Sequence, residues 1–245
     1  MKISGAQKLE NRKRIIRETV DMILENDFKS TTMRAVARAA GIGDATIYNY
    51  FPTKESILYA YYEDAMTACV EKLKVIENFN EYSLQEQLQT FFETELELFL
   101  PDREFVQKTF KQVFFSFSQD YNRLLPIRSL FFSVIDEMFG AAAEVGEIEE
   151  QVFQEMISFL IWDYNIGIIL YWINDESEAF SNTTVFNDKS IDLLCSLIQS
   201  GIVNKTFDIA IFLFRNHVLN KMQSAKDRFK TIDFVKRRFM GDDNA

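Results

Sequence analysis

The side chains most able to do chemistry in this sequence are four hydrogen-bonding groups that follow a glycine-containing turn. Thr46, Tyr48, Asn49 and Tyr50 lie close together, shortly after Gly41. Hydroxyl and amide groups of this kind hydrogen-bond to phosphate oxygens and to base edges. The sequence contains no HExxH pair, nucleophile motif, phosphate-binding loop or recognisable pair of catalytic carboxylates. These side chains therefore indicate contact with nucleic acid, and we expect no enzymatic activity.

Two short helices around one tight turn must position these side chains. Thr31 or Thr32 supplies the hydroxyl of a helix N-cap, and apolar residues follow it at helical spacing. Gly41 ends that helix, because glycine takes a positive φ without steric cost. We expect the next helix to run from about 44 to 50, burying Ile47 and leaving its polar side chains outside. Such a helix-turn-helix presents its second helix to the DNA major groove.

This pattern resembles the DNA-binding signature of the TetR family of one-component bacterial regulators. The resemblance covers roughly residues 15–58 and is carried by many matches at fixed spacing: Thr32, Ala37, Ala40, Gly41, Ile42, Ala45, Thr46, Tyr48, Tyr50, Phe51 and Lys54. Together with the residue types, it predicts a set of DNA-contacting residues: Thr32, Arg34, Gly43, Asp44, Ala45, Thr46, Tyr48, Asn49, Tyr50 and Lys54.

Three positions depart from the family pattern. Asn26-Asp27 stands where a glycine often ends the first helix, and Gly43 stands where a serine is common. Asp44 replaces a basic or neutral residue. A carboxylate facing phosphate would be repelled, whereas one that reaches a base edge could accept a hydrogen bond from cytosine N4. We therefore expect Asp44 to tune the operator sequence.

Composition and charge favour an all-α protein with two parts. The 245 residues include 8 Gly and 3 Pro and are 47% hydrophobic, which allows a large core but gives little turn chemistry for a β-rich fold. Residues 1–60 carry 10 Lys and Arg against 7 Asp and Glu, whereas the remainder carries 17 against 30. We expect a three-helix head with the helix-turn-helix over residues 1–53, and a larger helical body for effector binding and dimerisation over residues 54–245.

The cysteines and the N-terminus indicate a cytoplasmic protein. Cys69 and Cys195 are isolated, so we expect neither a disulfide framework nor a metal site, and no cofactor is implied. The N-terminus lacks the apolar run of a secretory signal. The apolar stretch 156–173 is long enough to span a membrane but carries Asp163 and Asn165 near its middle. We interpret it as a buried helix and expect no membrane insertion.

Aromatic residues at helical spacing dominate the predicted body. For any one of the 24 phenylalanines, core packing is the simpler role, but together these rings could line an effector cavity. The predicted effector-binding residues are Phe110, Phe114, Phe117, Phe131, Trp162, Asp163 and Asn165. Asp163 could contact the effector or make a buried structural hydrogen bond. The effector expected is a small molecule that is apolar or aromatic, with a small polar handle.

The C-terminal helices carry more apolar surface than one core needs. We interpret 175–187 as a loop, with Asn187 capping the helix that follows. The resemblance implies that the last long helices of two subunits pair as a four-helix bundle. The dimer-interface residues predicted are Ile191, Leu194, Ile198, Phe207, Ile211, Phe214 and Val218. The basic segment 224–239 could touch DNA or membrane, or be a solvated helix end.

Two functions remain open at this point. The first is a homodimeric, sequence-specific regulator, a repressor that a small effector releases from a palindromic double-stranded operator, as the resemblance implies. The second is a helical lipid or small-molecule carrier, or an enzyme, without a DNA role.

Overall fold

The computed structural model describes residues 4–115, 120–151 and 153–213. In these ranges every regular element is a helix, as the composition predicts. The predicted segment 224–239, together with Phe117, Phe214 and Val218, lies outside the described residues.

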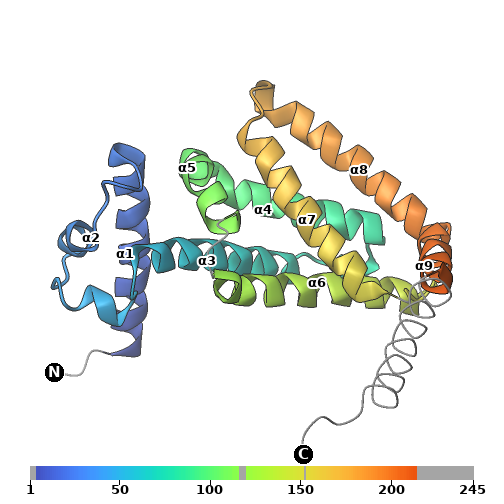
Figure 1. Ribbon diagram of the computed structural model, residues 1–245, viewed down its shortest axis with the longest axis horizontal. Helices are drawn as coiled ribbons and strands as arrows, with labels where there is room; N and C mark the ends of the chain where they lie inside the picture. Colours follow the sequence, from blue (N-terminus) through green and yellow to red (C-terminus); the bar gives the residue numbers. More distant parts are fainter. Residues whose placement is uncertain (1–3, 116–119, 152, 214–245) are drawn as a thin grey trace, which may run out of the picture.

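Three N-terminal elements form the head at one end of the molecule (Figure 1). They are α1 (Gly5–Asn26), α2 (Met33–Ala39) and the 3-10 helix η1 (Ile47–Asn49). Buried apolar side chains hold them together with the start of the next helix in a small core of their own: Ile15, Ile16, Val36, Ala37, Ala40, Ile47, Phe51, Ile57 and Ala60.

The helix α3 (Lys54–Lys74) leaves this head and runs into the body without a flexible linker (Figure 1). Thr53 caps its start, accepting a hydrogen bond from the backbone N–H of Ser56, whose hydroxyl accepts from the Thr53 N–H in return. Because α3 belongs to both parts, a displacement of its body end is transmitted to the head.

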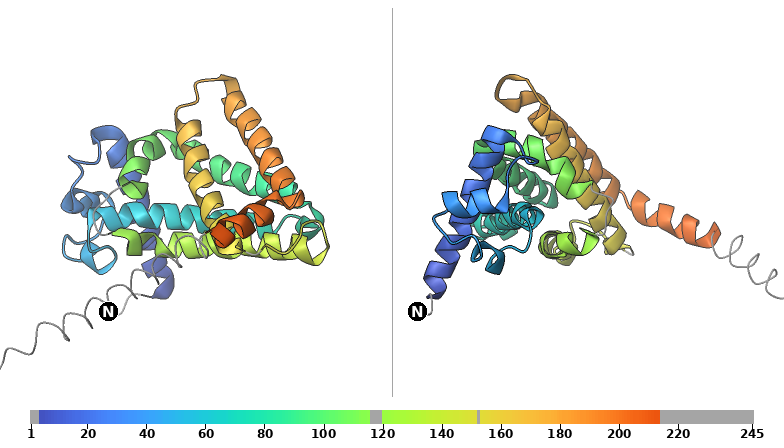
Figure 2. Two further views of the ribbon diagram at one scale, coloured as in Figure 1. Left: turned by 45° about the vertical axis from the view of Figure 1, so that its right-hand side comes forward. Right: turned by 60° about the vertical axis from the view of Figure 1, so that its left-hand side comes forward.

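Six further α-helices complete the described body. They are α4 (Leu84–Phe99), α5 (Arg103–Phe114), α6 (Leu125–Glu144), α7 (Gln154–Ile173), α8 (Ser181–Gln199) and α9 (Ile202–Leu213). The helix α3 packs against α4 and α6, while α8 lies across α4 and α7. In Figure 2, α9 extends away from the rest of the body.

The start of α8 differs from the prediction. The expected loop 175–187 contains the first two turns of this helix, which begins at Ser181. Asn187 is therefore no cap but a buried residue within α8. The tight connection before the helix explains the early start: the Asp175 carboxylate accepts hydrogen bonds from the Ser177 and Thr183 hydroxyls at 2.6 Å each and satisfies the free Thr183 N–H.

The apolar helix α7 is long and hydrophobic enough to cross a membrane by length and composition alone. Half of its most apolar window is buried within the protein. Its inner residues, including Ile161, Ile168 and Trp172, pack in the main core of the body. This packing supports the interpretation of α7 as a core helix.

Polar contacts also tie the head to the body. Arg17 of α1 donates to the Asp102 carboxylate at the α4–α5 junction over 2.8 Å, and the Tyr61 hydroxyl donates to the same carboxylate. Lys108 of α5 donates to the carbonyl of Leu24 at 2.9 Å. The orientation of the head is thus fixed by both α3 and α1.

Candidate nucleic-acid interface and effector site

The turn of the predicted helix-turn-helix has the expected backbone. Gly41 adopts a φ of +65°, and the N–H of Ile42 closes the end of α2 on the carbonyl of Ala37 at 2.9 Å. Thr32 is the N-cap of α2, since its hydroxyl accepts from the Ala35 N–H. Both results confirm the sequence prediction for the first half of the motif.

The second element is shorter than predicted. Instead of an α-helix from 44 to 50, a turn at 44–46 leads into the 3-10 helix η1. A segment this short forms too few hydrogen bonds to offset the unfavourable free energy of helix nucleation. Its residue types, among them Asp44, Asn49 and the β-branched Thr46 and Ile47, also favour turns or strands over an α-helix. Ile47 is completely buried and anchors the segment on the head core.

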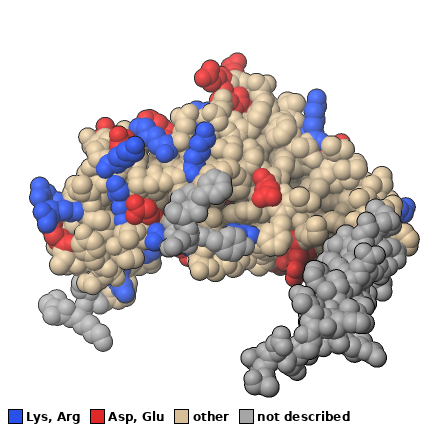
Figure 3. Space-filling view, in the orientation of Figure 1, with Lys and Arg blue, Asp and Glu red and all other residues tan. Residues whose placement is uncertain are grey.

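Most of the residues predicted to contact DNA lie on the surface of the head. Thr32, Arg34, Gly43, Asp44, Ala45, Tyr48 and Asn49 are exposed, while Thr46 and Tyr50 are half-buried beside them. Figure 3 shows Lys and Arg side chains over the head end of the molecule. Exposed hydroxyl, amide and guanidinium groups on α2 and on the segment that follows it suit contact with a nucleic-acid groove.

Asn11 is a positioning residue that the sequence analysis missed. It is buried in α1, and its amide donates to the Tyr50 hydroxyl at 2.9 Å while accepting from Arg14 at 2.9 Å. Tyr50 is thereby held against α1, with its own O–H free to donate. The available signal was the position of Asn11 four residues before Ile15, which places a polar group on the buried face of a helix.

Lys54 has a different environment from the one predicted. Its ammonium donates to the carbonyls of Phe28 and Thr31 and lies 4.1 Å from the centre of the Phe28 ring. These contacts fix the connection between α1 and α2. The geometry gives Lys54 a structural role in the head and does not support the predicted DNA contact.

Asp44 is paired within the candidate interface. Its carboxylate lies 3.2 Å from the guanidinium of Arg34, and both side chains are exposed. An exposed pair of this kind contributes little to stability, so either group can exchange its partner for a DNA group at small cost. The pair therefore decides how much of the Arg34 charge is available to DNA.

The Asp44→Asn variant is expected to bind DNA about fivefold more tightly and to discriminate less between operator sequences. The substitution removes the carboxylate that partly neutralises Arg34 and repels phosphate. Competition titrations against a randomised-site library will measure both effects, with Glu71→Gln on α3 as the control for loss of an exposed carboxylate. Unchanged base preference would exclude a role for Asp44 in operator recognition.

The predicted aromatic residues of the body form one cluster. Phe110 and Phe131 are fully buried, Trp162 is nearly so, and Phe114 is half-buried. The ring centres of Phe131 and Trp162 are 5.1 Å apart, and those of Phe110 and Phe114 are 4.4 Å apart. The sequence prediction thus identified side chains that α5, α6 and α7 bring together.

The structure places Asp163 outside the buried core of the body. Asp163 is exposed on the outer side of α7, whereas Asn165 is buried in the body. Two residues along a helix correspond to a rotation of about 200°, so both cannot face the core. The partner that the sequence analysis missed is Glu95 of α4, which is 3% exposed and accepts a hydrogen bond from Asn165.

Burial changes the chemistry of Glu95. Desolvation raises its pKa to about 8, because the charged form loses its water, and the Asn165 hydrogen bond offsets only part of that effect. One Glu95 oxygen and the Asn165 carbonyl oxygen have no hydrogen-bond partner within the part of the chain that the structure describes. A neutral carboxylic acid beside an amide is thus one of the polar features buried in a largely apolar core.

The Glu95→Gln variant is expected to lose a pH dependence of stability. Between pH 4.5 and about 8, Glu95 is protonated in the folded protein but ionised in the unfolded chain. The contribution of Glu95 to the free energy of unfolding therefore declines as pH rises through this window. From about pH 5.5 to about pH 7.5, the free energy of unfolding should fall by roughly 2–3 kcal/mol more in the unmodified protein than in Glu95→Gln. Urea denaturation will show this, and equal slopes would refute it.

An apolar groove lies between α3, α4 and α6. Its volume is about 300 Å³, and it is lined by Val70, Leu73, Lys74, Ile76, Phe79, Asn80, Gln87, Val134, Glu137, Met138 and Ala141. Leu73 and Met138 also belong to the main core of the body. Lys74 and Glu137 place one charge of each sign at this groove, and the Lys74 ammonium also pairs with Glu71 at 2.9 Å. The groove can therefore take an apolar chain with an anionic group near Lys74.

The dimer-interface prediction is partly wrong in its register. Ile191 and Ile198 are buried inside the subunit, where α8 covers α4 and α7, and Leu194 is packed partly against that core. Phe207 packs on Phe153, with ring centres 4.9 Å apart, while Ile211 is exposed. The periodicity detected the inner stripe of α8, because that stripe is the more regular one.

A second apolar stripe remains on the surface of α7 and α8. We call this the outer face; it consists of Leu160, Tyr171, Phe186, Leu193 and Leu197, which are between 38% and 60% exposed. The Tyr171 and Phe186 rings stack at 5.0 Å and join the two helices. Exposed apolar side chains on two neighbouring helices are typical of a subunit interface.

Comparison with known proteins identifies both parts of the chain. Residues 15–61 match the family model described as bacterial regulatory proteins of the tetR family, and residues 87–213 match the tetracyclin repressor-like C-terminal domain. The chain is 27% identical over 209 residues to the fatty acid metabolism regulator protein of Bacillus subtilis, covering 81% of this chain and 99% of that one.

Solved structures share the fold. The FadR of Bacillus subtilis in complex with stearoyl-CoA has a TM-score of 0.58 and 20% identity, over 77% of this chain and 98% of that chain. Thermus thermophilus FadR in complex with lauroyl-CoA has a TM-score of 0.57 and 19% identity, over 74% and 92%. Since the C-terminal match alone spans more than half of the chain and the head matches as well, the protein belongs to the TetR family of ligand-responsive, DNA-binding transcriptional regulators.

Proposed function

We propose that the protein is a homodimeric repressor in the bacterial cytoplasm, released from a palindromic operator by a long-chain acyl-CoA. Two observations support this effector class. Relatives of the same fold are described in complex with lauroyl-CoA and stearoyl-CoA. The body also offers an apolar groove beside α3, the helix that continues from the head.

The residues that line the groove favour an acyl-CoA as the effector, because most of them are apolar and suit an acyl chain. Each methylene buried there contributes about 0.8 kcal/mol, so a long chain gains much more than a short one. The groove borders the main core, where the aromatic cluster and the Glu95–Asn165 pair lie. A neutral Glu95 can donate to the thioester carbonyl of a chain that reaches it, and Lys74 can pair with a phosphate of the coenzyme.

The same groove explains how binding would reach the DNA. Val70, Leu73 and Lys74 are groove residues on α3, whose other end starts at the head. A chain inserted between α3 and α6 separates these helices, while the Arg17–Asp102 contact holds α1 to the α4–α5 junction. The head then changes its orientation relative to the body. A coupling free energy of about 1–3 kcal/mol between the two sites is sufficient for control.

Dimerisation through the outer face would present two heads to two operator half-sites. The stripe joins α7 and α8, the arrangement that pairs with its own copy in a four-helix bundle. A two-fold axis then makes the operator palindromic.

The test is a fluorescence anisotropy titration of a duplex from the promoter region upstream of the protein's own gene. We expect binding that weakens steeply with salt and that stearoyl-CoA weakens at least about tenfold. Coenzyme A without the acyl chain, and acetyl-CoA, are the matched controls and should have no effect. If coenzyme A alone releases the DNA, or stearoyl-CoA leaves the affinity unchanged, this effector assignment is wrong.

A further inference from the structure

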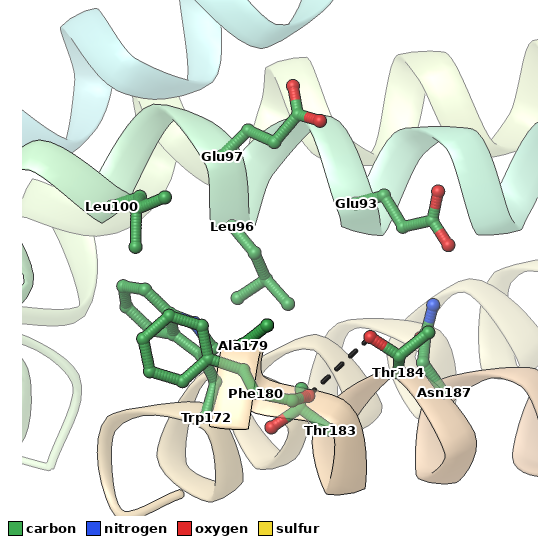
Figure 4. A pocket seen from close by; sticks show the side chains of 10 residues that line it. All are labelled: Glu93, Leu96, Glu97, Leu100, Trp172, Ala179, Phe180, Thr183, Thr184 and Asn187. Atoms are coloured by element: carbon green, nitrogen blue, oxygen red, sulfur yellow. Dashed lines mark hydrogen bonds between the residues drawn. The ribbon is translucent and has the colours of Figure 1, made fainter. Parts of the chain in front are cut away.

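A second pocket lies between α4 and α8, beside the connection that joins α7 to α8 (Figure 4). Its volume is about 370 Å³. The lining residues are Glu93, Leu96, Glu97, Leu100, Trp172, Ala179, Phe180, Thr183, Thr184 and Asn187. None of these residues lines the groove of the proposed acyl-CoA site.

The pocket has a polar end and an apolar end. Figure 4 shows Glu93 and Asn187 at one end, and Leu100, Trp172 and Phe180 at the other. Of the charged lining residues, Glu97 points away and lies 3.9 Å from Lys72, so Glu93 is the carboxylate that faces the polar end. Desolvation and the nearby charges of Asp188 and Glu97 raise the pKa of Glu93. A bound cation would offset the loss of hydration of Glu93 and its repulsion by these charges.

Asn187 supplies an independent sign of a missing partner. It is 1% exposed, and its carbonyl oxygen accepts from the Tyr164 hydroxyl at 2.9 Å. Its amide nitrogen has no hydrogen-bond partner among the described residues and points toward the gap below Glu93 (Figure 4). Buried amide groups are normally satisfied, so an unpartnered N–H beside a pocket calls for an acceptor in that pocket.

The apolar wall is built by an unusual backbone. Ala179 and Phe180 both adopt a positive φ, of 53° and 56°, a conformation that residues other than glycine rarely take. This backbone places Phe180 next to Trp172, with ring centres 5.9 Å apart, and Arg103 stacks over Phe180 at 4.7 Å. Strain retained in consecutive residues is typical of segments that shape a site.

We propose that this pocket binds a small organic amine that carries an aromatic or aliphatic ring and a hydrogen-bond acceptor near its nitrogen. The ammonium pairs with Glu93, the acceptor takes the hydrogen bond from Asn187, and the ring packs against Trp172 and Phe180. The phosphates of an acyl-CoA would be repelled by the same carboxylate. The site is therefore a second ligand site, chemically distinct from the proposed acyl-CoA groove.

Isothermal titration calorimetry at pH 8 with three ligands of similar shape tests this. The probes are 2-amino-1-phenylethanol, uncharged 1-phenylethanol and anionic mandelate. We expect the amine to bind about tenfold more tightly than the alcohol, and mandelate not to bind. The Glu93→Gln variant should bind the amine about tenfold more weakly and bind the alcohol with unchanged affinity. Asp192→Asn, which removes a carboxylate from α8 outside the pocket, should change nothing.

Equal affinities for the amine and the alcohol, full affinity in Glu93→Gln, or no detectable binding of the amine would each overturn the proposal. Glu93 is largely exposed and glutamine has the same shape, so the variant is expected to fold. Stearoyl-CoA binding to Glu93→Gln should be unchanged. That measurement separates a failure of this site from a failure of the acyl-CoA assignment.

Discussion

Replacing Leu193 and Leu197 together by glutamate is expected to give a monomer whose operator affinity is lower by at least about a hundredfold. Both leucines lie on the outer face, one helical turn apart, and are 59% and 38% exposed. Buried carboxylates without partners would be strongly unfavourable in a subunit interface. A single head retains contacts with only one half-site. Sedimentation equilibrium and anisotropy titration will measure the two effects.

Val75→Glu is the control, because Val75 is an 82% exposed apolar residue just beyond α3 and far from the outer face in sequence. It should remain dimeric and bind the operator normally. A double variant at Leu193 and Leu197 that still sediments as a dimer would show that the subunits associate through another surface.

Phe131→Ala is expected to lower the free energy of unfolding by about 3–5 kcal/mol and the melting temperature by roughly 10 °C. Phe131 is fully buried at the centre of the aromatic cluster, with ring centres 5.5 Å from Phe91 and 5.1 Å from Trp162. Truncation leaves a cavity that close-packed neighbours cannot fill. Thermal denaturation followed by circular dichroism is the measurement.

Phe115→Ala is the matched control for this loss of a ring, because Phe115 is half exposed at the end of α5. This variant should lower the free energy of unfolding by less than about 1 kcal/mol. If Phe131→Ala costs as little as Phe115→Ala, the cluster is loosely packed and already able to accommodate a ligand without rearrangement.

The head could be predicted largely from local chemistry. Thr32 and Thr53 cap helices because their hydroxyls reach the free N–H groups three residues on, and Gly41 supplies the positive φ of the turn. These interactions span few residues, so the sequence encodes them directly. The length of the element after the turn was not predictable in this way, because a few residues can form either an α-helical or a 3-10 turn.

The body shows where sequence patterns lose information. Apolar residues occur on both sides of α8, and only packing against α4 and α7 decides that Ile191 faces inward while Leu193 faces outward. In the sequence, Glu95 is one of several glutamates on an amphipathic helix, and its spacing does not mark it as buried. Its burial depends on the approach of α7 and Asn165, a contact between residues 70 positions apart. Such long-range contacts leave little trace in local spacing.

The central claim is that a ligand in the body and DNA at the head influence each other through α3. Thermodynamic linkage requires the effect to be reciprocal. The most direct measurement is the affinity for stearoyl-CoA, determined by calorimetry with and without saturating operator duplex. We predict that the operator weakens stearoyl-CoA binding by the same factor, about tenfold or more, by which stearoyl-CoA weakens operator binding. An affinity for stearoyl-CoA that is identical in the free and DNA-bound protein would contradict the account.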